Sequence, residues 1–175
     1  MRATTEWVRD SIRSAAWAPV AVFVLHLVFS RVLGWYLTVP GLDMPMHFLG
    51  GVAIAYFFAR SIRLESASPV LGALTTLGRC VLTIALVGLA TVVWELAEWT
   101  TDSLELTRAQ VGLDDTVLDM LLGLLGGVAF LLVSSRARTG LDATARDPSS
   151  RVALRREPRQ TGRASTDPGS ERRPE

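Results

Sequence analysis

The chain has 175 residues, of which 49% are hydrophobic, with a mean hydropathy of +0.31 and a formal net charge of +1. That length suits one domain with an appendage, and the hydropathy is high for a soluble protein. The single cysteine, Cys80, excludes an intrachain disulfide and every cysteine-based zinc motif. The sequence also contains no serine-nucleophile elbow, no phosphate-binding glycine loop and no nucleic-acid-binding motif, so we expect no nucleic-acid partner.

Four apolar segments follow one another along the chain. They cover residues 15–37, 45–59, 80–99 and 116–133. A helix needs roughly 20 apolar residues to cross a bilayer, and none of the segments has the regular polar face that a soluble bundle requires. We therefore predict an all-α integral membrane bundle of four transmembrane helices in residues 15–135, embedded in the lipid bilayer and preceded by a cytoplasmic segment, residues 1–14. Pro69 favours an extension of the third helix towards its N-terminus.

The C-terminal part has a different composition. Residues 1–135 carry eight Arg and eleven acidic residues, whereas residues 136–175 carry ten Arg and six acidic residues and hold almost no large apolar side chain. Such a segment cannot bury enough apolar surface to fold alone, so a disordered, Arg-rich cytoplasmic tail is expected there. Its arginines can contact anionic lipid headgroups, but a solvated tail without a specific role is the preferred interpretation.

The arginines also predict the orientation of the helices. Arginine gathers before the first segment, between the second and third, and after the fourth, whereas residues 38–44 have none and residues 100–114 have only Arg108. Because arginine excess marks the cytoplasmic side, we expect both termini inside and the loops at 38–44 and 100–114 outside. The protein is then a multi-pass protein of the cell inner (plasma) membrane.

Ionisable residues gather at the outer ends of these predicted helices. The members are Asp43 and His47 on the second helix, Glu95 and Glu98 on the third, and Asp115 and Asp119 on the fourth. Each pair is spaced by three or four residues, which puts its two side chains on one face of a helix. Acids at membrane depth are costly, normally face the bundle interior, and mark functional sites. Three helices thus each offer a polar stripe at one depth, and Arg31 can add a cation to the same layer.

Two kinds of chemistry suit such a cluster. Carboxylates and one imidazole can bind a divalent metal ion, for which all six residues are candidate ligands. Glu95, Glu98, Asp119 and His47 can equally supply a general acid and base for hydrolysis. Asp43 and Asp115 also suit ordinary helix caps, His47 a hydrogen-bonded core histidine, and His26 a purely structural role in the first helix.

Small residues recur on the fourth helix. Gly123 and Gly127 have the spacing that lets two helices approach closely, and Gly126 lies beside them. The pattern is typical of helix–helix contacts in membranes, so a homo-oligomer through Gly123 and Gly127 is one expectation. Incidental glycines in a glycine-rich chain are the alternative.

Three short motifs carry a resemblance to a known family. They are Asp43-Met-Pro-Met-His47-Phe-Leu-Gly-Gly, Trp94-Glu-Leu-Ala-Glu98 and Asp115-Thr-Val-Leu-Asp119-Met-Leu-Leu-Gly123. In this order they resemble the YjdF-like family of small bacterial inner-membrane proteins and, more distantly, the VanZ-like family linked to teicoplanin resistance. The VanZ-like pattern has Lys where this chain has Met44 and Gln where it has Glu98, which favours the YjdF-like branch. The resemblance implies a membrane protein of four to six helices without a defined reaction.

Three hypotheses for function follow. The first is a membrane protein whose outward-facing acidic/His site performs metal-assisted hydrolysis of an envelope or lipid-linked substrate. The second is a small transporter or proton-coupled carrier in which the acids form a relay. The third is a non-catalytic membrane scaffold whose polar cluster fixes helix packing.

Overall fold

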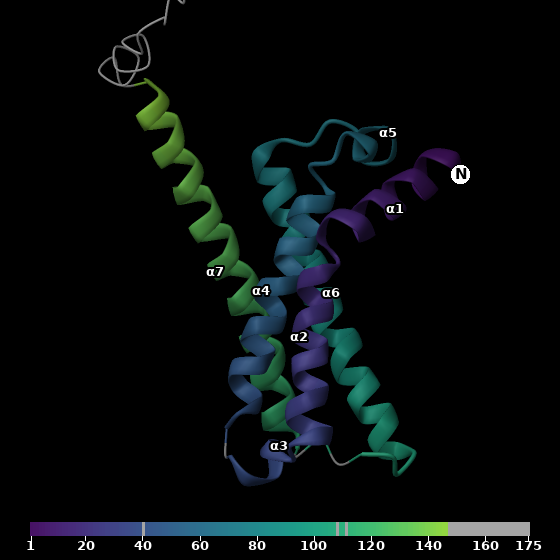
Figure 1. Ribbon diagram of the computed structural model, residues 1–175. Coiled ribbons are helices and arrows are strands. Elements are labelled where there is room, and N and C mark those ends of the chain that lie inside the picture. Colours follow the sequence, from purple (N-terminus) through teal and green to yellow (C-terminus); the bar gives the residue numbers. More distant parts are fainter. Residues whose placement is uncertain (40, 108, 111, 147–175) are drawn as a thin grey trace, which may run out of the picture. The chain divides into compact units, whose positions relative to one another are not determined.

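Every regular element is a helix in the part of the chain that the computed structural model describes, which is residues 1–39, 41–107, 109–110 and 112–146 (Figure 1). In chain order the elements are α1 (Arg2–Ala15), α2 (Trp17–Leu27), the π-helix η1 (Val28–Val32), α3 (Trp35–Thr38), α4 (Asp43–Ser61), the 3₁₀ helix η2 (Glu65–Ala67), α5 (Ser68–Leu71), α6 (Thr76–Ser103) and α7 (Leu113–Arg146). The chain divides into two compact units, Met1–Arg136 and Ala137–Glu175, and the packing described below belongs to the first.

The N-terminal helix meets α2 at a bend. The axis of α1 makes an angle of 58° with the helix of residues 17–32, and the break lies at Ala16. Pro19, in the first turn of α2, has no N–H to donate to the carbonyl of Ala15, which accounts for a bend at this point. Helix α1 is amphipathic, and its Trp7 donates an indole hydrogen bond of 2.9 Å to the carbonyl of Ser61. This contact holds α1 against the C-terminal end of α4.

The first predicted apolar segment is not one continuous α-helix. The α-helical hydrogen bonding of α2 gives way to the π-helix η1, and Gly34 then adopts a left-handed conformation with φ +63° before the short α3. A positive φ strains any residue with a side chain, so glycine permits the turn there. The segment predicted as residues 15–37 is therefore divided into α2, η1 and α3.

Helix α4 lies at the centre of the first unit. It packs against α1, α2 and α6, and α2, α4 and α6 run alongside one another (Figure 1). Apart from Met46, the side chains that it buries are small, among them Ala53, Ala55 and Ala59. Small residues let helix backbones approach closely, which gives dispersion contact where hydrophobic driving force between helices is weak. Contact through small residues therefore assembles this bundle.

The connection between α4 and α6 differs from the prediction for Pro69. Residues Ser68–Leu71 form a separate short helix, α5, which ends at Gly72 with φ +69°. Helix α6 begins afresh at Thr76, where the hydroxyl of Thr75 accepts a hydrogen bond of 3.0 Å from the amide of Gly78. An N-cap of this kind satisfies a backbone donor that would otherwise have no partner. Pro69 therefore does not extend α6.

Two helices in the described residues are long and apolar enough to cross a membrane, α6 (Thr76–Ser103) and the Leu113–Ala137 part of α7. The bent pair Arg2–Ala15 and Trp17–Val32 adds a third if it counts as one span. Helix α4, with 19 residues, is long enough but not apolar enough, because polar residues such as His47 and Arg60 lower its mean hydropathy. The prediction of four spans is thus met in part, with two clear spans and up to three.

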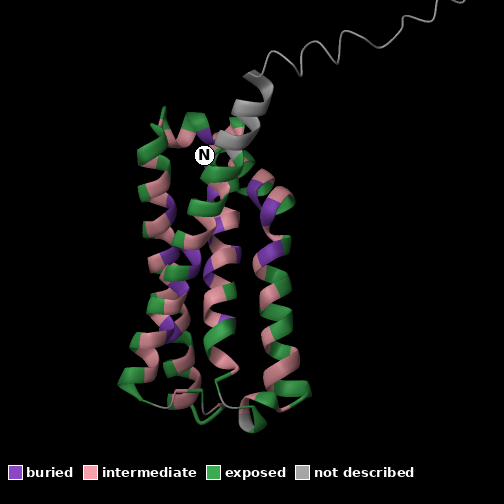
Figure 2. Cartoon of the chain, turned by 90° about the vertical axis from the view of Figure 1, so that its left-hand side faces the viewer, coloured by how far each residue is buried: buried purple, intermediate pink, exposed green. Residues whose placement is uncertain are grey.

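The apolar helices have little protein around them. In the most apolar stretch of 18 residues, only 17% of α6 and 22% of α7 is buried inside the protein. Figure 2 shows exposed residues along the helices of the bundle. Apolar surface of this extent is not stable in water, so lipid is the medium that fits it. Helix α7 also continues to Arg146, beyond the predicted boundary at residue 135. The predicted disordered tail otherwise lies in residues 147–175, outside the described residues.

Candidate functional site

The predicted polar stripes of α4 and α7 meet at His47. On α4, the Nε2 atom of His47 lies 3.3 Å from Oδ1 of Asp43, one helical turn before it. From α7, Oδ2 of Asp119 lies 3.6 Å from the same nitrogen. Asp119 is only 3% exposed. Two carboxylates on different helices therefore face one imidazole nitrogen.

Glycine packing between α4 and α7 places these residues together. A Cβ added to Gly51 would meet the backbone oxygen of Gly123, and one added to Gly126 would meet the carbonyl oxygen of Phe48. Any side chain at either glycine would force the two backbones apart. Gly51 lies one turn after His47, and Gly123 one turn after Asp119. The close approach of the glycines therefore brings the imidazole and the carboxylate into contact one turn away.

Helix α6 supplies the carboxylates on the other side of the imidazole. Oε1 of Glu95 lies 3.8 Å from Nδ1 of His47, and Glu95 is 6% exposed. Glu98, one turn further along, is half-buried and accepts a hydrogen bond of 2.8 Å from the indole of Trp94. The two nitrogens of His47 thus face different carboxylates, with Asp43 and Asp119 at Nε2 and Glu95 at Nδ1.

Within the cluster of Asp43, His47, Glu95, Glu98 and Asp119, two buried carboxylates are poorly satisfied. Among the described residues Oδ1 of Asp119 accepts no hydrogen bond, and besides His47 the carboxylate of Glu95 has only the side-chain amide of Gln110 close to it, beyond ordinary hydrogen-bond distance. An ionised carboxylate in a low-dielectric interior carries a large desolvation cost unless it is paired, and removing one member of a buried pair costs roughly 3–5 kcal/mol. Arg31 does not compensate them, since its side chain is exposed and no ion pair to the cluster forms among the described residues. A bound cation or protons fit this arrangement.

Two sets of three residues in the described chain have ligand atoms close enough to hold one ion. They are Asp43, His47 and Asp119, and His47, Glu95 and Glu98, with the ligand atoms of each set within 4.8 Å of one another. Imidazole nitrogen with carboxylate oxygen suits ions such as Zn²⁺, Fe²⁺ or Mn²⁺. Both sets leave coordination positions open, which is typical of catalytic rather than structural metal sites.

The remaining predicted ligand, Asp115, belongs to neither set. It is half-buried in the first turn of α7, beside Asp114, where acidic side chains favour the positive end of the helix dipole. Five of the six predicted site residues therefore come together around His47. Asp115 lies on the same face of α7, one turn closer to the helix N-terminus than Asp119.

The second histidine has ordinary neutral partners. Nδ1 of His26 is 2.9 Å from the hydroxyl of Tyr36, and the imidazole makes edge contacts with the rings of Tyr36 and Trp94. His26 and Tyr36 thus share one hydrogen bond, whose direction depends on the tautomer of the imidazole. This environment agrees with the structural role considered for His26.

Three residues in or near this layer were not singled out as site residues. Trp94 holds Glu98, and its spacing of four residues from Glu98 is a signal that sequence can provide. Gln110 donates a hydrogen bond of 3.3 Å to the backbone carbonyl of Glu95 from the loop after α6, and Tyr36 reaches His26 across η1 and Gly34. Neither of these two contacts has a periodic signal, because each depends on how an irregular segment folds back.

A cavity of about 240 Å³ adjoins the cluster. Side chains and backbone of α2, α4 and α6 form its walls, and His47 belongs to both the cavity and the cluster. His26 and Trp94 line the same end, whereas most of the remaining wall is apolar. The polar cluster therefore has an apolar space beside it within the bundle.

The expected oligomer contact involves residues that already have partners within the chain. Gly123 lies against Thr91 of α6, and Gly127 lies against Val87. A Cβ built at Gly127 would be 3.1 Å from Cγ1 of Val87. The glycine face of α7 thus packs on α4 and α6 of the same protomer. A homo-oligomer through Gly123 and Gly127 stays a prediction.

The chain resembles known proteins over the whole of this site. A family model described as "Predicted membrane protein (DUF2238)" matches residues 11–140, a range that includes every predicted site residue. An uncharacterised protein of Thermotoga maritima is 37% identical over 120 residues, which are 66% of this chain and 59% of that protein. The match thus spans less than two thirds of the length of that relative. No solved structure matches the chain, and neither comparison shows the more distant VanZ-like resemblance.

Proposed function

We propose that this chain, which belongs to the DUF2238 family of membrane proteins, binds a divalent metal ion at His47 and uses it to hydrolyse a lipid-linked or other envelope substrate. This family is the YjdF-like family that the three motifs resemble, so that part of the resemblance is confirmed. The proposal rests on one observation, that buried carboxylates of α6 and α7 converge on His47 and that Oδ1 of Asp119 accepts no hydrogen bond from the described residues.

The metal position that this geometry favours is the Nε2 side of His47. Asp43 and Asp119 both lie closer to this nitrogen, at 3.3 and 3.6 Å, than Glu95 lies to Nδ1, at 3.8 Å. If Nε2 held a metal, Nδ1 would carry the proton and would face Glu95. Histidine ligands of metal sites usually donate their second N–H to a carboxylate, which fixes the ring and its tautomer. Glu95 would then be the group that orients His47.

Hydrolysis requires a water molecule and a proton acceptor. A metal held by Asp43, His47 and Asp119 would supply the activation of water that hydrolysis needs. Glu98, the more exposed of the two α6 carboxylates, is the candidate general base, and its hydrogen bond to Trp94 holds its position. Because the site lies within helices that suit a bilayer, the substrate would reach it from the membrane or from its outer surface.

Metal content is the direct test. The full chain, purified in detergent, is analysed by inductively coupled plasma mass spectrometry beside His47→Gln and the matched control His26→Gln. We expect about one metal ion per chain in the wild type and in His26→Gln, and less than about a tenth of that in His47→Gln, because an essential ligand is lost. Equal metal content in the two variants would contradict the proposal.

Hydrolysis is tested on the same preparations. The protein with its metal is incubated with a total bacterial lipid extract, and the lipids are followed by mass spectrometry for a species that disappears. The product should form with the wild type and should be absent with His47→Gln or after chelation. Equal product formation with and without metal would show that the hydrolysis does not depend on a metal ion.

A proton-coupled carrier is the second candidate function, and one observation favours it. The contacts Asp119–His47–Glu95 form a carboxylate–imidazole–carboxylate chain across the bundle. Protons can compensate the buried carboxylates in place of a metal ion. The carrier would move protons in reconstituted vesicles with a pH-sensitive dye inside, and Glu95→Gln would stop that flux. A proton flux that is the same in vesicles with the wild-type protein and in vesicles without protein would exclude this function.

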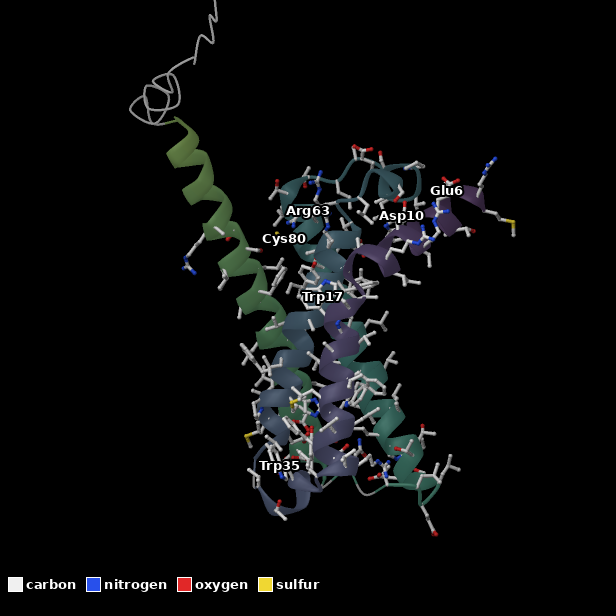
Figure 3. All side chains as sticks on the ribbon, viewed as in Figure 1. Glu6, Asp10, Trp17, Trp35, Arg63 and Cys80 are labelled. Atoms are coloured by element: carbon white, nitrogen blue, oxygen red, sulfur yellow. The ribbon has the colours of Figure 1, made fainter. Side chains whose placement is uncertain are left out.

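The topology is part of the proposal. We propose that α4 is a span although it is less apolar than α6 and α7, because its 19 residues measure about 28 Å and its polar face is covered by other helices. Figure 3 shows Trp35 at one end of the first unit and Arg63 and Cys80 at the other. The positive-inside rule then puts the Arg63 end, with both termini, in the cytoplasm of the bacterial cell and the polar cluster near the outer surface.

Cysteine accessibility tests this orientation. In a Cys80→Ser background, Ser103→Cys places an exposed thiol at the C-terminal end of α6, and Ser68→Cys places one in α5, before the N-terminal end of α6. We expect a membrane-impermeant maleimide to label Ser103→Cys in intact cells and Ser68→Cys only after lysis. The opposite result would show the reverse orientation in the membrane, with the polar cluster near the cytoplasmic surface.

A further inference from the structure

The apolar cavity beside His47 extends along the bundle. On α4 its lining runs from Met46 and His47 to Ile54, and on α6 from Trp94 back to Val87. From His47 to Ile54 and from Trp94 to Val87 the chain advances seven residues. Seven residues of helix correspond to about 10 Å, and both helices give the same length. One end of the cavity is therefore polar, at His47 and Trp94, and the other end lies about 10 Å deeper, between Ile54 and Val87.

The absence of a side chain at Gly50 contributes to this space. A Cβ built at Gly50 meets no atom within 4 Å, whereas one built at the adjacent Gly51 would collide with α7. Gly51 is thus required for helix packing. Gly50, which lines the cavity, leaves open a volume that a larger residue would fill.

We propose that this cavity binds one acyl chain of a membrane lipid, with the lipid headgroup at the cluster around His47. The inference rests on the proposed function, because it identifies the substrate of that site as an acyl lipid. The cavity lies in helices suited to a bilayer, so the molecules at its entrance are lipids, whose hydrocarbon is largely acyl chains. Its apolar wall offers few of the two to four polar partners that a bound water needs.

The dimensions of the cavity fit one chain rather than two. A methylene group takes up about the room of a water molecule, about 30 Å³, so 240 Å³ accommodates roughly eight such groups. Eight groups joined by carbon–carbon bonds of about 1.5 Å reach from one end of the cavity to the other. Two chains would have about four groups each and would not reach the deep end.

The geometry also places the scissile bond. A headgroup attached to the chain would leave the cavity at its polar end, where His47 belongs to both the cavity and the cluster. In hydrolysis the oxygen of water bonds to the electrophilic carbon or phosphorus of the ester, the ester bond to the leaving oxygen breaks, and that oxygen receives a proton. The proton lost by the attacking water passes to Glu98 or to solvent.

Photocrosslinking tests the cavity without any need for activity. The probe is phosphatidylglycerol with a diazirine near the end of one acyl chain, mixed into vesicles that contain the full-length protein. After irradiation, labelled peptides are located by mass spectrometry. We expect labels on the segments around Ile54 of α4 and Val87 of α6, which form the deep end of the cavity.

Two variants fill the cavity, and a third is the control. Gly50→Leu and Ala90→Leu place leucine in the lining, whereas Ala85→Leu makes a similar change on an exposed position of α6. Labelling of the deep end should fall about tenfold or more in each of the first two, as expected when an apolar pocket loses the room for even one or two methylene groups. It should be unchanged in Ala85→Leu. Ala90→Leu decides the question if Gly50→Leu does not fold.

The outcomes separate this inference from the proposed function. His47→Gln should lose metal and yet keep the deep label, because the chain contacts apolar residues. Deep labelling of a wild type that holds no metal would support the cavity while refuting the metal site. Labels that are confined to the outer surfaces of the helices, or that persist in both filled variants, would overturn the inference. Stronger deep labelling by a diazirine-bearing polyprenyl phosphate than by the acyl probe would also overturn it.

Discussion

Two carboxylate regions at the same end of α6 differ in how their oxygens are satisfied. Asp102 accepts hydrogen bonds from the hydroxyl of Thr107 and from the backbone amides of Ala109 and Gln110, both at 2.9 Å. Glu95, two turns earlier on the same helix, is buried, and its Oε1 faces Nδ1 of His47 at 3.8 Å, beyond hydrogen-bond distance. The first acid therefore organises the loop before α7, whereas the second faces the imidazole of the candidate site. Pairing, more than residue type or depth, distinguishes a structural acid from a candidate functional one.

The largest expected effect would come from Asp119→Asn, measured as zinc affinity by competition with a chelating dye. The affinity should fall by at least about 100-fold, more than the 10–100-fold that loss of an outer partner of a metal ligand costs. Asp102→Asn, whose carboxylate has its own partners, is the matched control and should leave the affinity unchanged. If both variants bind zinc equally well, the distinction between the two regions fails.

Removal of the metal should lower stability, and only through the cluster. With free metal at 100 times its dissociation constant, binding adds about 2.7 kcal/mol to the free energy of unfolding. We expect a chelator to lower the thermal unfolding temperature of the wild type and of Asp102→Asn in detergent. His47→Gln should not respond to the chelator. A wild type that is equally insensitive would indicate that protons, not a metal, neutralise Glu95 and Asp119.

Glu95→Gln should have an intermediate effect. If Glu95 orients His47 from outside the metal's coordination shell, the amide variant should bind metal about 10-fold more weakly. If the ion instead lies at the Nδ1 side, among His47, Glu95 and Glu98, the loss should equal that of His47→Gln. The same dye competition thus decides which of the two ligand sets holds the metal.

The smallest effect on the site is expected for Asp102→Asn. The amide keeps an oxygen for hydrogen bonding but loses the charge that strengthens the bonds from the loop amides. The thermal unfolding temperature should fall slightly, and amide hydrogen exchange should rise at Ala109 and Gln110. Metal content should stay that of the wild type. A loss of metal in this variant would show that the loop and the cluster are one cooperative unit.

Local features of the site were predictable from spacing alone. Asp43 and His47 are four residues apart, so one face of α4 had to carry both, and the structure has them in contact at 3.3 Å. The helices themselves followed from apolar runs, as α6 and α7 illustrate. The break at η1 and Gly34 and the separate helix α5 were not predicted. They depend on a local change of hydrogen bonding and on single positive φ angles, which apolar periodicity does not report.

By itself the sequence determined that helices would form in an apolar medium and which residues share a face, because both follow from hydropathy and from 3.6 residues per turn. Only the tertiary structure decided which faces meet. Gly51, Gly123 and Gly126 let α4 and α7 approach until His47 and Asp119 touch, while α6 brings Glu95 to the other nitrogen. Contacts between helices depend on the shapes of two surfaces at once, and no pattern within one helix contains that information.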